Sequence, residues 1–272
     1  MCTVSFLPKS QGFYLAMNRD EKRDRSTGLP PAVFELEGHR AVFPREPTGG
    51  TWISANDSGV CLALINWHRI KREPDKSACS RGEVVRKLAG IPTSDEIADT
   101  IKKLSLRNLR PFRLIAIVPD AKRIIEWRWN LNRLSMRKHS WESHHWFSSG
   151  FNERRAEIER AKICASSVVG GVDPCRGNGS RHRKSAGVNA ASYSLKWLRR
   201  LHRSHQPERG PFSICMHRAT AATVSYTEIA VSAHSVVMRY RDGPPCSRRL
   251  TTSTTCKLSR VPTTNRYGKS RC

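Results

Sequence analysis

The chain has 272 residues, enough for one large domain with a sizeable core or for two small ones. Its composition, 38% hydrophobic and 26% charged, is more typical of a folded body with polar appendages than of a uniformly globular chain. No apolar run reaches the length of a membrane span, and no basic region with a long apolar stretch opens the chain, so neither a transmembrane segment nor an export signal is expected.

The net charge of +25 would by itself suggest a nucleic-acid or anionic-membrane partner. The charge is unevenly distributed, however: residues 171–272 carry 19 Lys and Arg against 4 Asp and Glu, whereas residues 1–170 carry 29 against 19. The chain also lacks the interleaved aromatic and basic residues of single-strand-binding modules. Nucleic acid is therefore not the expected partner.

The cysteine pattern indicates reduced thiols in a cytoplasm. There are nine cysteines, an odd number, without a Cys-x-x-Cys pair or a zinc-like spacing. The clustered histidines, His139, His144 and His145, match no regular metal site either. We therefore expect no metal and no cofactor.

The first predicted element is a β-hairpin at the N-terminus. Residues 3–7 and 13–17 are largely apolar, and residues 8–12 supply turn formers. If Pro8 faces Phe13, paired positions sum to about 21, and Cys2 lies opposite Arg19. The turn therefore places the polar end of the second strand next to Cys2.

Cys2 is a candidate nucleophile that carries its own base. A cysteine is small enough for the preceding Met1 to be trimmed, which leaves an amine and a thiol on one residue. The amine has a reference pKa of about 7.7–8.0, so near neutral pH it can accept the thiol proton. A small second residue present by chance is the alternative.

Two stretches carry a family resemblance: Met1-Cys2-Thr3-Val4 and Ala16-Met17-Asn18-Arg19-Asp20-Glu21. They resemble the opening of the NRDE family of transport and Golgi organisation 2-like proteins. More distantly, they are similar to the N-terminal nucleophile (Ntn) hydrolases of the bile salt hydrolase and penicillin V acylase type. The resemblance implies an α+β fold, an αββα sandwich, with an N-terminal cysteine, but it does not supply a reaction. The hypothesis for the reaction is an N-terminal nucleophile amidohydrolase that acts on C–N bonds other than peptide bonds.

The resemblance also carries a geometric difficulty. In the similar hydrolases, two residues separate the arginine from the aspartate, whereas Arg19 and Asp20 are adjacent here. Neighbouring residues of a strand point to opposite faces, so both can reach Cys2 only if the strand ends or bulges there.

The next segments predict a loop, a second hairpin and two helices. Residues 22–31 mix charges with breakers and read as a loop, in which Arg25 is most simply a solvated residue. Residues 49–69 predict a hairpin whose second strand ends at Asn66, and they resemble the family's Gly-Gly-Thr-Trp and Ala-Leu-x-Asn stretches. Asn66 is either an oxyanion donor, as the resemblance implies, or a strand cap. Helices are expected over 80–88 and 95–104, the second capped by Thr93 or Ser94.

The middle of the chain predicts a further hairpin, residues 112–118 and 124–129, with Trp127 and Trp129 on one face as core residues. A helix is expected over residues 156–165. Just before it, Ser149 stands where the similar hydrolases carry an asparagine that donates to the oxyanion.

The remaining segments predict a folded domain of residues 1–246 with one insertion and a tail. Residues 166–191 form an irregular basic insertion, and residues 193–201 a helix. Strands are expected at 211–218, 223–231 and 235–240. The Ser-, Thr- and Arg-rich residues 247–272 contain no acid and too few apolar side chains to offset the entropy of ordering, so a disordered basic tail is expected.

Two functions are compatible with these features. The first is an N-terminal cysteine hydrolase of a small acyl or amide substrate, with Cys2, Arg19, Asp20 and Asn66 as catalytic residues. Substrate-binding residues would then be Asn18, Ser149 and Arg218. The second is a non-catalytic protein that handles or traffics a lipid-like or haem-like ligand on the same fold. Neither function predicts an oligomeric state.

Overall fold

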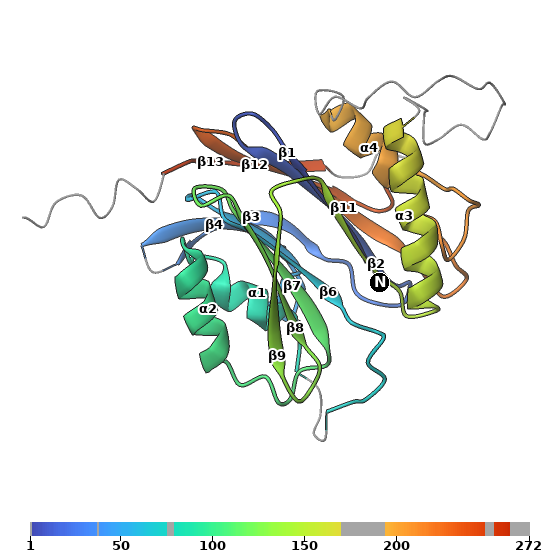
Figure 1. Ribbon diagram of the computed structural model, residues 1–272, viewed down its shortest axis with the longest axis horizontal. Coiled ribbons are helices and arrows are strands. Elements are labelled where there is room, and N and C mark those ends of the chain that lie inside the picture. The colour runs from blue at the N-terminus through green and yellow to red at the C-terminus, as the bar shows by residue number, and fades with distance from the viewer. Residues whose placement is uncertain (1, 37, 75–78, 170–193, 248–252, 262–272) are drawn as a thin grey trace, which may run out of the picture.

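Two antiparallel β-sheets face each other, and a pair of helices covers the outer side of each sheet (Figure 1). The computed structural model describes residues 2–36, 38–74, 79–169, 194–247 and 253–261. The helix–sheet–sheet–helix order is the αββα sandwich that the resemblance implies, so the predicted fold class is confirmed.

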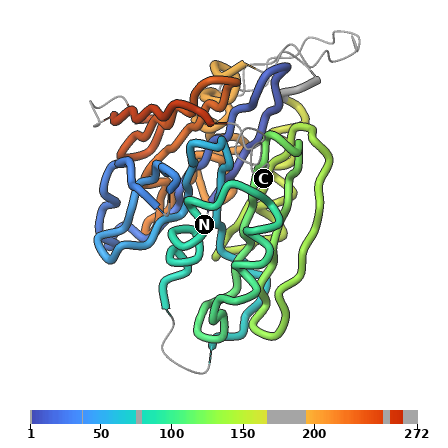
Figure 2. Tube along the Cα trace, turned by 90° about the vertical axis from the view of Figure 1, so that its left-hand side faces the viewer, coloured from blue at the N-terminus to red at the C-terminus, as the bar shows by residue number. Residues whose placement is uncertain are grey.

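The first sheet has six strands in the order β10-β1-β2-β11-β12-β13. Their bounds are β1 Cys2–Pro8, β2 Phe13–Lys22, β10 His144–Ser148, β11 Ala221–Val231, β12 Ser235–Asp242 and β13 Ser253–Ser259. The N-terminal hairpin thus lies in the middle of a sheet whose other half comes from the end of the chain, as the neighbouring blue and orange strands in Figure 2 show.

The second sheet has seven strands in sequence order, because each connection joins neighbouring antiparallel strands. Their bounds are β3 Leu29–Leu36, β4 His39–Arg45, β5 Ile53–Asn56, β6 Cys61–Asn66, β7 Phe112–Val118, β8 Arg123–Trp129 and β9 Leu134–His139. The two predicted hairpins, β5–β6 and β7–β8, are both present in this sheet.

Helices α1 (Gly82–Leu88) and α2 (Ser94–Lys103) cover the second sheet, and α3 (Glu153–Val169) and α4 (Leu195–Arg203) cover the first (Figure 1). Thr93 caps α2 as predicted, since its side chain accepts a hydrogen bond from the Glu96 backbone N–H. Helix α3 is longer than the sequence indicates, beginning at Glu153 and ending at Val169.

Alternation along the strands divides the apolar residues between two cores. Side chains at the even-numbered positions of β1, such as Phe6, and at the odd-numbered positions of β2, such as Phe13, fill the space between the sheets. On the outer face of the second sheet, Trp127 and Trp129 pack with α1 and α2, which confirms their predicted core position. A fully buried side chain of this size contributes roughly 1.5–3 kcal/mol, so the alternation holds each strand in its register.

Two segments differ from the sequence-based expectation. Residues 211–218 form no strand beyond a bridge between His217 and Ala222, because local hydrogen bonds such as Cys215 N–H to Ser204 O take the place of a ladder. Ser253–Ser259, predicted as part of a disordered tail, form β13 on the edge of the first sheet. An edge strand needs only one buried face, and Leu258 supplies it at 2% exposure. Residues 170–191, 248–252 and 262–272 lie outside the described residues.

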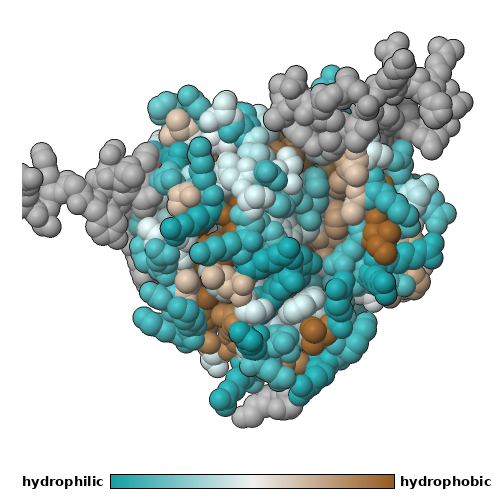
Figure 3. Space-filling model, viewed as in Figure 1, coloured by the Kyte–Doolittle hydropathy of each residue, from teal (hydrophilic) through white to brown (hydrophobic). Residues whose placement is uncertain are grey.

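The surface is mainly polar. The face in Figure 3 is predominantly hydrophilic, with hydrophobic residues scattered across it. Among the described residues, no helix has the length and apolar character needed to cross a bilayer.

Candidate functional site

A cavity of about 270 Å³ lies where β1 begins and β2 ends. The loop of residues 46–52, the end of β6 and the start of α1 form its other walls. The four residues predicted as catalytic all line this cavity, although they come from three different strands: Cys2, Arg19, Asp20 and Asn66. The structure therefore brings the predicted group together.

Cys2 and Arg19 are direct partners across the N-terminal hairpin, in the predicted register. Both are almost fully buried, with Cys2 7% and Arg19 5% exposed. Cross-strand partners share a face of the sheet, and this face is the one between the two sheets. The thiol therefore belongs to the inter-sheet core at the point where that core opens into the cavity.

Arg19 is held by an acid and an aromatic ring. Its Nη2 lies 2.9 Å from Glu46 Oε1, and its guanidinium lies 4.3 Å from the centre of the Trp52 ring. Glu46 also pairs with Arg25, whose Nη2 is 2.8 Å from Oε1. Arg25, a solvated loop residue in the simplest sequence interpretation, is thus 44% exposed at the mouth of the cavity.

Asp20 is directed to the helix-covered face of the sheet. Its Oδ1 accepts a 2.6 Å hydrogen bond from Thr223 Oγ1, and its Oδ2 lies 3.5 Å from Nη2 of the fully buried Arg160. The Arg160 guanidinium also donates to the carbonyl oxygen of Cys2 at 3.4 Å. Arg160 on α3 therefore links Asp20 to the backbone of the predicted nucleophile.

A β-bulge accompanies this arrangement. In β11, the register shifts between Thr223 and Ser225, opposite Asp20 and Arg19 of β2. The side chains of the adjacent Arg19 and Asp20 nonetheless point to opposite faces of the sheet, as in a regular strand. The Arg19 side chain thus points between the sheets, whereas the Asp20 carboxylate points to Thr223 and Arg160 on the helix-covered face, although both residues line the cavity.

The environment of the Cys2 thiol disfavours the thiolate. Burial raises the pKa of Cys2 above its ordinary value, and the negative charge of Asp20 acts in the same direction. The positive charges of the N-terminus and, to a smaller extent, of the Arg19 guanidinium lower this pKa but do not reverse the effect of burial. The thiol is therefore protonated at neutral pH.

Arg81 brings a second arginine into the cavity, and the sequence-based prediction missed it. Its Nη1 donates to the carbonyl oxygen of Pro111 at 3.3 Å. Burial lowers the pKa of Arg81, and the nearby Arg110, which also lines the cavity, adds to the effect. Within the described parts of the chain, Arg81 forms no ion pair with a carboxylate, so its charge faces the cavity without an acidic partner.

The three predicted substrate-binding residues lie elsewhere. Asn18 is fully buried on the helix side, where its amide donates to the carbonyl oxygens of His202 and Ile214, both at 2.9 Å. Ser149 is buried in the turn after β10 and accepts a hydrogen bond from the Phe151 N–H. Arg218 packs its guanidinium 4.7 Å from the Phe151 ring. None of the three lines the cavity described above.

Comparison with solved structures finds similar folds. The conjugated bile acid hydrolase of Clostridium perfringens, solved as a mutant, superposes with a TM-score of 0.54 at 10% sequence identity, covering 95% of this chain and 92% of that one. Penicillin V acylase from Agrobacterium tumefaciens gives a TM-score of 0.52 at 11% identity, covering 95% and 86%. At these identities the likeness establishes the fold.

Sequence comparisons place the chain in a family. No curated protein matches it. The family model described as Transport and Golgi organisation 2 matches residues 1–170, which include β1 to β10 and all the residues that line the cavity. The chain, with its cysteine-bearing hairpin and αββα sandwich, therefore belongs to the Transport and Golgi organisation 2 family.

Proposed function

We propose that this protein is an N-terminal cysteine hydrolase that cleaves an amide or related acyl bond of a small molecule. The observation that carries the proposal is the pairing of Cys2 with Arg19 in a cavity that also contains Asn66. Membership of the family and the likeness in fold to two acyl-bond hydrolases support it.

The nucleophile needs a base because its thiol is protonated in this environment. Removal of Met1 supplies that base as the α-amine of Cys2 itself, with a reference pKa of about 7.7–8.0. The amine takes the thiol proton, and Sγ then attacks the substrate carbonyl carbon. The carbonyl π electrons move to the oxygen, where the side-chain amide of Asn66 donates a hydrogen bond to the oxyanion.

The second half of the reaction returns the proton. As the C–N bond breaks, the ammonium group of Cys2 protonates the leaving nitrogen, which departs as an amine and leaves a thioester on Sγ. A water molecule, deprotonated by the same amine, then cleaves the thioester to a carboxylic acid and restores the thiol. Asp20, fixed by Arg160 and Thr223, stabilises the ammonium form during both steps.

Arg81 suggests the class of substrate. An arginine that faces a cavity without an acidic partner favours an anionic group such as a carboxylate or sulfonate on the bound molecule. We expect Arg81→Met to raise KM for anionic acyl substrates and to leave KM for uncharged analogues nearly unchanged.

The test combines intact mass with turnover. The mass should show that Met1 is absent, and a panel of N-acyl amino acids, conjugated bile acids and penicillin V should identify a hydrolysed bond. Cys2→Ala should abolish turnover, and Cys2→Ser should reduce it strongly. Cys256→Ser, on the far edge strand β13, serves as the matched control and should retain full activity.

Two results would reject the proposal. Turnover that survives Cys2→Ala would remove Cys2 as the nucleophile. A retained Met1, together with no turnover across the panel, would favour the non-catalytic alternative, a binding protein for a lipid-like or haem-like ligand. The charged lining of the cavity fits that alternative less well than it fits an anionic substrate, because haem and lipid sites are mainly apolar.

A further inference from the structure

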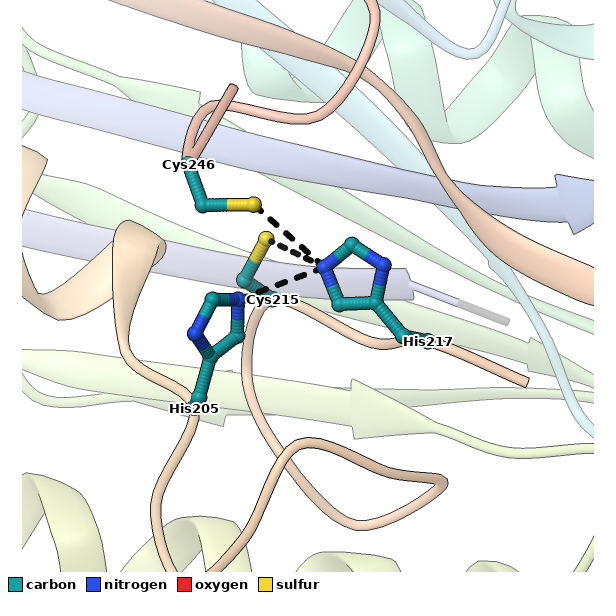
Figure 4. A group of neighbouring side chains, drawn as sticks. All are labelled: His205, Cys215, His217 and Cys246. Carbon is teal, nitrogen blue, oxygen red and sulfur yellow. Dashed lines mark hydrogen bonds between the residues drawn. The ribbon is translucent and has the colours of Figure 1, made fainter. Parts of the chain in front are cut away.

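Four metal-binding side chains converge at a place that the proposed reaction does not use. They are His205, Cys215, His217 and Cys246, and each offers a ligand atom within 4.8 Å of the others. Figure 4 shows both sulfur atoms and the imidazole of His205 directed toward Nε2 of His217. The distances from that nitrogen are 3.2 Å to His205 Nε2, 3.6 Å to Cys215 Sγ and 3.3 Å to Cys246 Sγ.

The three distances to His217 Nε2 are close to those between ligands of a single ion. For Zn–S bonds of about 2.3 Å and Zn–N bonds of about 2.0–2.1 Å, the edges of a tetrahedron are about 3.5 Å for a sulfur–nitrogen pair and about 3.3 Å for a nitrogen–nitrogen pair. The measured sulfur–nitrogen and nitrogen–nitrogen distances lie within a few tenths of an ångström of these values. Two nitrogens and two sulfurs also form a typical donor set for zinc.

The fold holds the four ligands from three separate segments. His205 lies just after α4, Cys215 and His217 flank Met216 in the irregular segment before β11, and Cys246 follows β12. Backbone hydrogen bonds join these segments, including Cys215 N–H to Ser204 O at 2.9 Å. The ligands are therefore positioned by the fold before any ion binds.

We infer that His205, Cys215, His217 and Cys246 form a structural zinc site. The protein supplies all four ligands, which leaves no open position for water or substrate and distinguishes the site from a catalytic centre. Cys215 is fully buried, and the other three ligands are half-buried. Zinc at this place adds to the local hydrogen bonds that hold residues 211–218, which lack regular strand pairing.

The site is connected to the candidate active site by two hydrogen bonds. The backbone N–H of Met216, between two of the ligands, donates to Thr223 Oγ1 at 2.9 Å. That hydroxyl in turn donates to Asp20 at 2.6 Å. Zinc therefore holds the segment that orients Thr223, and through it the carboxylate behind Cys2.

The experiment measures metal on the full-length chain, purified without a metal-affinity step and dialysed against metal-free buffer. Elemental analysis should find close to one equivalent of zinc per chain. After removal of the metal by a chelator, titration with Co²⁺ should produce a thiolate-to-cobalt charge-transfer band and the visible absorption of a tetrahedral site. Zinc should then abolish both signals by displacing the cobalt.

Variants assign the signal to the four residues. Cys246→Ser and the double variant Cys215→Ser/Cys246→Ser should lose the charge-transfer band and most of the zinc. Cys256→Ser and His234→Asn, which lie outside the cluster, are the matched controls and should retain both. Near-ultraviolet circular dichroism accompanies each measurement, because the ligand variants can fail to fold. If they do not fold, the cobalt spectrum of the unmodified chain tests the inference instead.

Three results would overturn the inference. The first is unmodified protein that holds no zinc and shows no cobalt–thiolate band. The second is metal retained in full by a folded double variant. The third is a Cys215–Cys246 disulfide, found by mass spectrometry of the unreduced protein, that persists when zinc is supplied together with a reductant.

Discussion

Arg160 provides the sharpest test of how the candidate site is held together. It is fully buried, and it makes its ion pair with Asp20, which is itself 1% exposed. Arg160→Met keeps most of the side-chain volume but leaves the Asp20 carboxylate buried without its guanidinium. Breaking a buried ion pair on one side typically costs about 3–5 kcal/mol, and the lost hydrogen bond to Thr3 Oγ1, 2.9 Å long, adds to that cost.

Urea unfolding, followed by tryptophan fluorescence, measures this loss directly. Arg154→Met, at an exposed position of the same helix, is the matched control and should change the unfolding free energy by less than about 0.5 kcal/mol. Adding Asp20→Asn to Arg160→Met removes the stranded charge, so the double variant should be more stable than Arg160→Met. A double variant that is no more stable, or an Arg160→Met cost below about 1 kcal/mol, would refute the assigned ion pair.

Three further changes test other parts of the fold through urea unfolding. Burial alone would raise the pKa of Glu126, but its two arginine partners lower it to about 2. Glu126→Gln should therefore lower the free energy of unfolding by about 3 kcal/mol at pH 7, and by progressively less as the pH falls from 4.5 toward 2. An equal loss at pH 3 and pH 7 would contradict this. Burial lowers the pKa of His202 to about 3, so below pH 6.5 the unfolded chain gains this proton and the folded chain does not, and this residue alone should lower the stability by about 2 kcal/mol between pH 7 and pH 5; the fall measured for His202→Gln should be smaller than that of the unmodified chain by about this amount. Gly12→Ala should cost at least about 1–3 kcal/mol, because φ is +95° and a Cβ would overlap the carbonyl oxygen of Val231; an unchanged midpoint would argue against this turn geometry.

The register of the N-terminal hairpin could be predicted because it depends on local information. The turn between Pro8 and Phe13 and the two apolar runs allow one pairing, and that pairing places Cys2 opposite Arg19. The family resemblance then supplied the layer order, which local patterns do not contain. Strand β13 was missed because its stability comes from the free edge of β12, a property of the assembled sheet.

The site was only partly predictable for a related reason. Asn66 could be found because it ends a recognisable strand, whereas Arg81, at the N-cap of α1, and Arg160, on α3, occupy positions that look like ordinary charged surface. Arg160 occupies a fully buried position that no helical pattern of apolar residues marks. The His–Cys cluster combines ligands from three loops without regular spacing, so it becomes visible only when the loops are placed in space.

The position of β2 between β1 and β11 has a consequence for how the protein is made. Asp20 and its partner Thr223 are separated by 203 residues. At roughly 5–20 residues per second, a ribosome needs about 10–40 s to synthesise that interval. Strand β2 therefore waits through most of translation without its neighbour β11, and the first sheet cannot be completed until the last part of the chain has been synthesised.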